Sequence, residues 1–180
     1  NTTDNKIGTV DSAPIDLDSD AFAFPIGQNR GLLDQEHMTV DHAGRVHVLL
    51  SHMPDDQPDD ADFGRARSKS QFFHYWRDID GNWTELPMNI AAQGTWRGKL
   101  AVSSGDNLYA VLPNIRIASA SAVAQWTNWT LIDKSRDGLY FSDPLIDRQQ
   151  LFTSDRLTVY APTTIVNGSV FIDTLSYTIY

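Results

Sequence analysis

The sequence predicts an all-β protein made of consecutive four-stranded antiparallel blades of a β-propeller. Short runs of β-branched and aromatic residues recur between turn signals, and no stretch of ten or more residues has helical periodicity. The same strand pattern also repeats along the chain. Hydrophobic residues make up 41% of the 180 residues and aromatic residues 11%, which is enough apolar surface to bury a core.

Ten segments have the length and residue types of strands. Between them stand residues that tolerate a tight or left-handed backbone, as in HAG at 42–44 and SGD at 104–106. The expected strands are 38–41, 45–51, 71–77, 82–86, 99–103, 107–112, 116–122, 128–132, 157–161 and 169–179.

The repeats set the size of the structural unit. Residues 39–50 align with 101–112, and 106–113 align more weakly with 155–162. The distance between the first two copies is lengthened by the Pro- and Asp-rich insertion that begins at 54. Four short strands every ~40–50 residues is the period of a propeller blade.

This period divides the chain into parts of one propeller domain. They are the tail of a preceding blade at 1–28, a blade at 29–98 with an acidic Pro-rich insertion at 54–68, a blade at 99–142, and a last blade at 143–180. Closed propellers have at least four blades, so the remaining blades should come from the same precursor or from a second chain. An open β-sandwich of similar strands is the alternative fold.

Charge and composition exclude several classes of function. The formal net charge is −9, which argues against a nucleic-acid partner and against a polybasic membrane anchor. No apolar run approaches the ~20 residues needed to span a bilayer. The absence of cysteine excludes thiol nucleophiles, thiolate metal sites and disulfides.

Four segments carry a resemblance to a known family. WRDIDGNWT at 76–84 resembles a degenerate Asp-box, the turn of sialidase-like propellers, with Asp80 and Gly81 at the turn. The blocks at 30–41 (RGLLDQEHMTVD), 96–100 (WRGKL) and 137–144 (DGLYFSDP) are similar, in this order, to the C-terminal half of BNR-repeat propellers. That family includes ulvan lyases and rhamnosyl-glucuronate polysaccharide lyases.

The resemblance implies a function as well as a fold. It implies a secreted, seven-bladed propeller that needs no cofactor and has a sugar site at the mouth of its central channel. There it cleaves a uronate-containing glycan by β-elimination, with the family's catalytic His and Tyr lying largely in earlier blades. This chain would then hold part of the site.

Elimination beside a uronate needs a cation for the carboxylate, a base for the C5 proton and an acid for the leaving oxygen. In a propeller, the loops that enter the first strand of each blade converge on the channel mouth. This placement selects His37 as the catalytic candidate, although a structural role for this histidine remains open. The substrate-binding candidates are Arg30, Gln35, Glu36, Trp96, Arg97 and Lys99, and a second loop set adds His52, Arg65, Arg67 and Asn114.

Two further kinds of site are compatible with the sequence. The carboxylate run at 55–62 could ligate a structural calcium ion, but it lacks the spacing of a dedicated calcium loop and also fits a solvated insertion. Sequons for N-glycosylation begin at Asn1, Asn82, Asn128 and Asn167.

Two other functions compete with a lyase. A non-catalytic, lectin-like propeller would keep the aromatic and arginine contacts but would lack an acid and a base. A sialidase-type hydrolase would need a carboxylate pair, or an arginine triad with a nucleophilic tyrosine. It ranks third because Glu36 is the single glutamate expected at the mouth.

Overall fold

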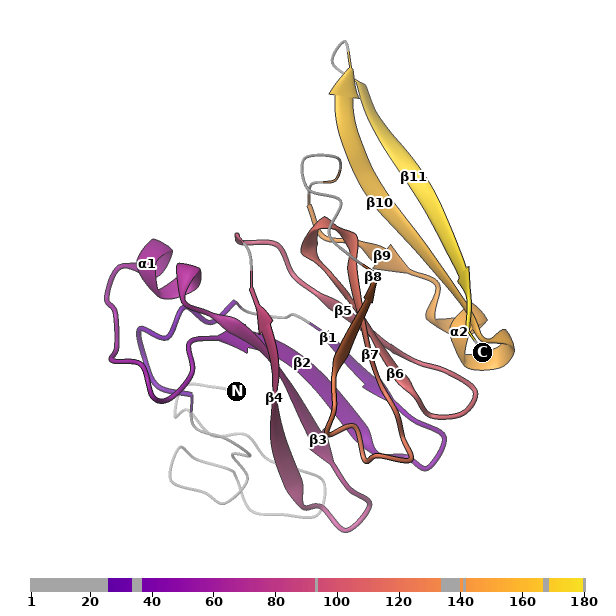
Figure 1. Ribbon diagram of the computed structural model, residues 1–180, viewed down its shortest axis with the longest axis horizontal. Helices are drawn as coiled ribbons and strands as arrows, with labels where there is room; N and C mark the ends of the chain where they lie inside the picture. Colours follow the sequence, from indigo (N-terminus) through magenta and orange to yellow (C-terminus); the bar gives the residue numbers. More distant parts are fainter. Residues whose placement is uncertain are drawn as a thin grey trace, which may run out of the picture.

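The chain folds into three antiparallel sheets that lie one against the next (Figure 1). The computed structural model describes residues 26–33, 37–92, 94–133, 140, 142–166 and 169–179, with backbone alone at 164–166. Each sheet is made of strands that are consecutive in the sequence, and no Greek-key crossing connects the described strands.

Two of the sheets have four strands in chain order. Sheet A contains β1 (His37–Val40), β2 (Val46–His52), β3 (Gln71–Arg77) and β4 (Trp83–Ala91). Sheet B contains β5 (Lys99–Val102), β6 (Leu108–Leu112), β7 (Arg116–Ala120) and β8 (Thr130–Asp133).

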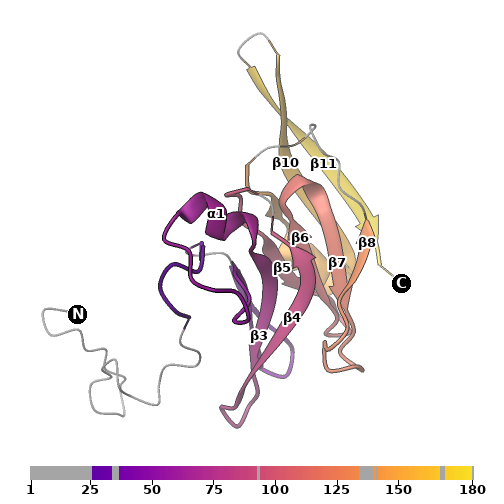
Figure 2. The same ribbon diagram turned by 60° about the vertical axis from the view of Figure 1, so that its left-hand side comes forward.

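The third sheet is smaller and ends in a long hairpin. Sheet C contains β9 (Leu145–Ile146), β10 (Arg156–Val166) and β11 (Ser169–Thr178), with β10 in the middle. The β10–β11 hairpin projects beyond the rest of the molecule (Figures 1 and 2). The all-β prediction is confirmed, and the sheets are compatible with the blades of a propeller.

Short helices were not expected from the sequence. They are α1 (Phe63–Ser68), the 3₁₀ turn η1 (Pro113–Ile115) and α2 (Arg148–Ser154). Asp62 and Asp147 cap α1 and α2, accepting the backbone N–H groups of Arg65 at 2.8 Å and Gln150 at 2.9 Å. Helices of six and seven residues are too short to show a periodic pattern. None of the described helices has the length and apolar character of a membrane span.

Sheet B is covered on both faces, which accounts for its apolar sequence. All five residues of β6 are buried, and their side chains alternate between two cores. The core between sheets A and B includes Leu49, Phe72, Leu100, Leu108, Leu112 and Trp126. The core between sheets B and C includes Tyr109, Val111, Ile117, Leu151, Leu157 and Val159.

The strand registers confirm the alignment of 39–50 with 101–112. Val40 pairs with Val46 in sheet A, and the aligned residues Val102 and Leu108 pair in sheet B. The turn before the second strand of each repeat has a left-handed residue at the same position: Gly44 with φ 83°, Asp106 with φ 60° and Asp155 with φ 53°.

The aspartates at this position connect each sheet to the one before it. The Asp106 carboxylate accepts the backbone N–H of His42 at 3.0 Å, and the Asp155 carboxylate accepts that of Ser104 at 2.8 Å. His42 and Ser104 occupy equivalent positions in the aligned repeats. We call these two connections the turn latches.

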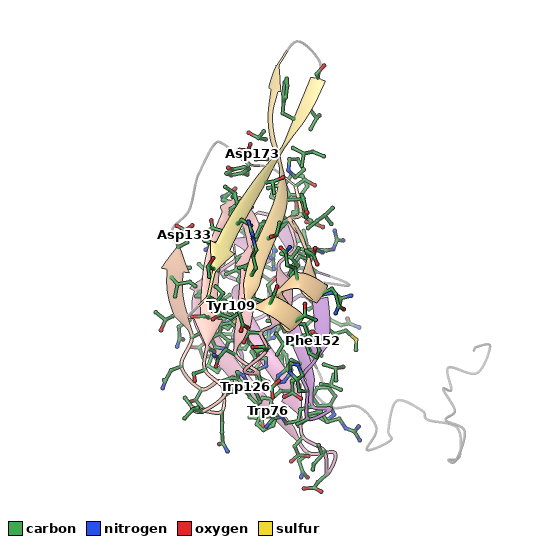
Figure 3. The ribbon with its side chains drawn as sticks, turned by 90° about the vertical axis from the view of Figure 1, so that its right-hand side faces the viewer. Trp76, Tyr109, Trp126, Asp133, Phe152 and Asp173 are labelled. Carbon is green, nitrogen blue, oxygen red and sulfur yellow. The ribbon has the colours of Figure 1, made fainter. Side chains whose placement is uncertain are left out.

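A buried polar chain runs across sheet A, on the face that packs against Trp126 and Trp129. The Asp41 carboxylate accepts His47 Nε2–H at 3.2 Å, and His47 Nδ1 lies 3.0 Å from His74 Nε2. Both imidazoles are fully buried. Trp76 and Trp126 lie beside them, toward the end of the stack where the β1–β2 turn is found (Figure 3).

Candidate functional site

Those candidates for catalysis and substrate binding that the structure describes belong to one end of the sheets, which we call the loop end. It is the end at which β1 and β5 begin side by side, and it also holds α1 in the β2–β3 connection (Figure 1). Loops at this end come from every sheet, so distant parts of the sequence can contribute to one surface.

His37 joins the first strands of sheets A and B. Its Nδ1 accepts the backbone N–H of Leu100 at 3.1 Å, so the proton of the neutral ring is on Nε2. Burial, with the positive charges of Arg148 and Lys99, lowers the pKa of His37 to about 4. At neutral pH the ring is therefore uncharged and offers an N–H donor rather than a basic lone pair.

Lys99 and Arg148 place positive charge around this ring. Lys99 is the first residue of β5, is half-buried, and makes no ion pair with the described residues. Arg148 is the first residue of α2 and is exposed, and its guanidinium donates to the carbonyl of Met38 at 3.5 Å. We call His37, Lys99 and Arg148 the His37 cluster.

Arg97 and Trp96 lie in the loop that leads into β5. The Arg97 backbone N–H donates to the Asp143 carboxylate at 2.6 Å, and its guanidinium lies 3.5 Å from the same group. Arg97 thus ties the loop before β5 to the loop before β9. The Trp96 side chain is exposed, as a stacking platform for a sugar would be.

Arg30 has a different environment from the one expected. It is buried, and its guanidinium donates to the carbonyls of Pro54 and Gln57 at 2.5 Å each. It also pairs with Asp55 and Asp59 at 3.1 Å. The structure therefore uses Arg30 to hold the acidic insertion. Gln35 and Glu36 lie outside the described residues.

Two other arginines shape the loop end through backbone carbonyls. The Arg67 guanidinium donates to the backbone carbonyls of Gly94 at 2.9 Å, Ser51 at 3.1 Å and Gly31 at 3.2 Å. Arg116 donates to Ala91 at 3.0 Å. Arg65 is exposed and pairs with Asp60 at 2.9 Å. The candidate Arg67 is thus part of the scaffold.

Sequence reasoning missed Tyr75, the partner of His52. His52 Nδ1–H donates to the Met53 carbonyl at 2.8 Å, so its Nε2 can accept the Tyr75 hydroxyl proton at 2.7 Å. Burial lowers the pKa of His52, and burial with the charge of Glu85 raises that of Tyr75 well above its usual range. Both side chains are at most 3% exposed, so this pair lies beneath the surface.

The acidic insertion uses several of its carboxylates within the chain. Asp60 pairs with Arg65 and Lys69, and Asp62 caps α1. Within the described ranges, no group of three His, Asp or Glu side chains is arranged to hold a metal ion. Calcium binding stays an untested prediction.

The β3–β4 turn and the sequons can be placed in part. Asp78, rather than Asp80, organises the Asp-box-like turn, because it accepts the backbone N–H groups of Asp80 at 2.9 Å and Asn82 at 2.8 Å. Asn82 and Asn128 are exposed. Asn1 and Asn167 lie outside the described residues, and glycosylation stays a prediction.

Comparison with models of protein families gives a match to the first half of the chain. A family model described as "BNR repeat-containing family member" matches residues 1–90, which is half of the chain. The matched part ends within β4, so it includes most of sheet A. A search of curated proteins finds no match.

Proposed function

Because the chain belongs to the BNR repeat-containing family, we propose that it is part of a secreted polysaccharide lyase. In this proposal the three sheets are blades of a seven-bladed propeller whose remaining blades come from the same precursor or from a second chain. The loop end binds a uronate-containing polysaccharide, and the assembled protein cleaves it by β-elimination.

The His37 cluster is the observation that supports this proposal most. The chain has a net charge of −9, yet Lys99 and Arg148 lie close enough to His37 to lower its pKa. Positive charge gathered on an acidic protein is suited to an anionic ligand. The exposed Trp96 adds a surface for the apolar face of a sugar ring.

The elimination assigns a task to each group. A base removes the C5 proton, the C4–O bond breaks as the C4–C5 double bond forms, and the leaving oxygen takes up a proton. Lys99 and Arg97 neutralise the uronate carboxylate, which makes the C5 proton more acidic. His37 donates its Nε2–H as a hydrogen bond to a sugar oxygen. The base for the C5 proton and the acid that protonates the leaving oxygen both come from the blades outside this chain.

A glycan-binding propeller without catalysis is the second candidate. One specific observation favours it: the His37 ring accepts the Leu100 N–H and so lacks a lone pair for proton removal. Such a protein would bind the same polysaccharide through the same cations and leave it intact.

The test is to incubate the assembled protein with rhamnosyl-glucuronate and ulvan-type polysaccharides. A lyase releases an unsaturated uronate that absorbs ultraviolet light, and a lectin binds without this product. Lys99→Met should reduce binding about tenfold, because one charge that faces the ligand is lost.

Lys69→Met is the matched control, since Lys69 is an exposed lysine already paired with Asp60 at 3.1 Å. If wild-type protein neither binds nor cleaves any uronate-containing polysaccharide, the proposal is wrong. Equal effects of the two lysine substitutions would reject the loop end as the site.

A further inference from the structure

A hollow of about 640 Å³ lies beside the first strands of the three sheets. Its walls come from β1, the end of β5, β9 and α2, so it extends away from the His37 cluster along the edge of the sheets. The lining residues that matter chemically are Met38, Val40, Ile146, Arg148, Gln149 and Phe152.

One side of the hollow is an exposed apolar strip. Met38 is 55% exposed and Val40 is 45% exposed, although both are in a strand. Phe152 is held in place by stacking on His42, with the ring centroids 3.7 Å apart. An apolar strip of this kind can cover the C–H face of a sugar ring.

The other side of the hollow supplies polar groups. Arg148 and Gln149 are exposed. Among the described residues, Arg148 makes one hydrogen bond, from its guanidinium to the Met38 carbonyl at 3.5 Å. The Asp147 carboxylate is also part of the wall, but it is held by the N–H of Gln150 at 2.9 Å. Arg148 therefore has guanidinium donors left for a carboxylate.

Arg148 belongs to both the hollow and the His37 cluster. Its guanidinium donates to the carbonyl of Met38, which lines the hollow and follows His37 directly in β1, so the hollow adjoins the His37 cluster. A polysaccharide bound at the His37 cluster would have its neighbouring sugars in reach of the hollow. A polymer with repeated uronates would present a second carboxylate there.

We propose that the hollow is a subsite for a second acidic sugar of the same polysaccharide chain. Arg148 pairs with its carboxylate, Gln149 with a hydroxyl, and the strip of Met38 and Val40 contacts the ring. This assignment rests on the proposed function, which it extends from a single uronate to a recognised sequence of sugars.

The experiment compares ligands of two lengths on the assembled protein. Calorimetry with a glucuronate-containing disaccharide and with a tetrasaccharide of the same repeat measures each affinity. Arg148→Gln should weaken the tetrasaccharide about tenfold more than the disaccharide, because only the longer ligand loses a direct carboxylate contact. Lys99→Met should weaken both ligands.

Arg156→Gln is the matched control, because Arg156 is an exposed arginine at the start of β10, bonded to Ser176 rather than to the hollow. A second variant, Val40→Asp, puts a negative charge in the wall at a residue outside the His37 cluster, so it should weaken the tetrasaccharide and leave the disaccharide unchanged. Val123→Asp, in the turn region before β8, is its control.

The outcomes separate the two proposals. If wild-type protein binds neither ligand, the proposed function is wrong and the subsite with it. If wild-type protein binds both ligands equally, or Arg148→Gln and Val40→Asp affect both equally or not at all, the subsite alone is wrong.

Discussion

Asp41, His47 and His74 show how one buried hydrogen-bonded chain can make a junction between sheets sensitive to pH. Burial opposes the charged form of Asp41, but hydrogen bonds from Arg45 and His47 outweigh it and lower the Asp41 pKa. Burial, with the neighbouring His47, lowers the pKa of His74 to about 3. The folded state thus keeps His74 neutral where the unfolded chain would protonate it.

We predict that the free energy of unfolding falls as the pH drops from about 6.5 toward 3. At pH values above the pKa of histidine in the unfolded chain, His74 is neutral in both states, so its burial does not oppose folding through a charge. Below it the unfolded state binds more protons, so acid favours unfolding. His37, with a pKa lowered to about 4, acts in the same direction.

Urea unfolding at several pH values checks this, with His74→Gln as the comparison. The variant should be less stable at pH 7 but show a flatter dependence on pH. Parallel curves for the two proteins would rule out His74 as a source of the acid sensitivity.

Gly31 and Gly44 allow a sharp test of close packing. Both have positive φ, 65° and 83°. A Cβ on Gly31 would lie 2.8 Å from the backbone carbon of Ala66, whereas one on Gly44 would meet nothing within 4 Å. Gly31→Ala should therefore lower the unfolding free energy by roughly 1–3 kcal/mol more than Gly44→Ala. Thermal denaturation of both variants measures the difference, and equal losses would contradict the steric explanation.

The sequence could predict the place of a site residue only where that place follows from the residue's position relative to a strand. His37 and Lys99 were selected as the entrances to first strands, and the structure places them together. Arg30 was selected by the same rule, but its partners in the insertion depend on how that loop folds back. Tyr75 was missed because the residue opposite His52 is Gln71, four residues away along β3, so the strand pairing alone does not bring the two side chains together.

At the scale of whole elements, the turn latches hold neighbouring sheets together, and their contribution to stability can be measured. Asp106 accepts the backbone N–H of His42 and lies 2.7 Å from its Nδ1. Asp106→Gly keeps the left-handed backbone, as in the aligned Gly44, and removes only the carboxylate. We expect a loss of about 1–2 kcal/mol in the free energy of unfolding.

Asp106→Asn is the matched comparison, because it keeps an acceptor oxygen. It should lower the free energy of unfolding by less than Asp106→Gly does. Chemical denaturation measures both variants. If the asparagine and glycine variants are equally stable, the hydrogen bond from the His42 backbone N–H to the side chain at position 106 contributes nothing to the free energy of unfolding.

Most strands were predicted within a few residues, since alternation and turn chemistry are local. β3 has the bounds expected for it. β10 extends to Val166, beyond the expected end at 161, because its hairpin partner β11 provides hydrogen bonds there. β9, with two residues, and α2, with seven, are too short for a periodic signal.

At the scale of the whole molecule, β11 has an unpaired edge among the described strands. Sheet C has three strands where sheets A and B have four. β11 is ten residues long with Asp173 as its one charged residue, and that carboxylate is bonded to Tyr140. Val170, Phe171 and Ile172 are 53–68% exposed. A long, weakly charged edge is a template for pairing with another strand.

We therefore predict that the isolated 180-residue chain self-associates. Ile172→Lys should shift it toward the monomer, because a lysine on an edge opposes strand addition. Val123→Lys is the control, since Val123 is 96% exposed but outside every strand. Sedimentation velocity measures both, and a wild-type chain that stays monomeric at high concentration would contradict the prediction.

The number of blades in a ring could not follow from this sequence. A repeat predicts the unit and its neighbour contacts, and sheets A, B and C show such contacts. The curvature that closes a ring is the sum of small rotations over all its blades. The three sheets of this chain do not by themselves fix that sum.

The turn latches also bear on how such a chain can lengthen in evolution. Each latch runs from an aspartate of the later sheet to a backbone N–H of the earlier one. Sheet B carries both halves, the acceptor Asp106 toward sheet A and the donor N–H of Ser104 toward sheet C. A tandem duplication of sheet B would therefore insert a new unit already equipped to join both of its neighbours, so the number of units could change without any further substitution at the junctions.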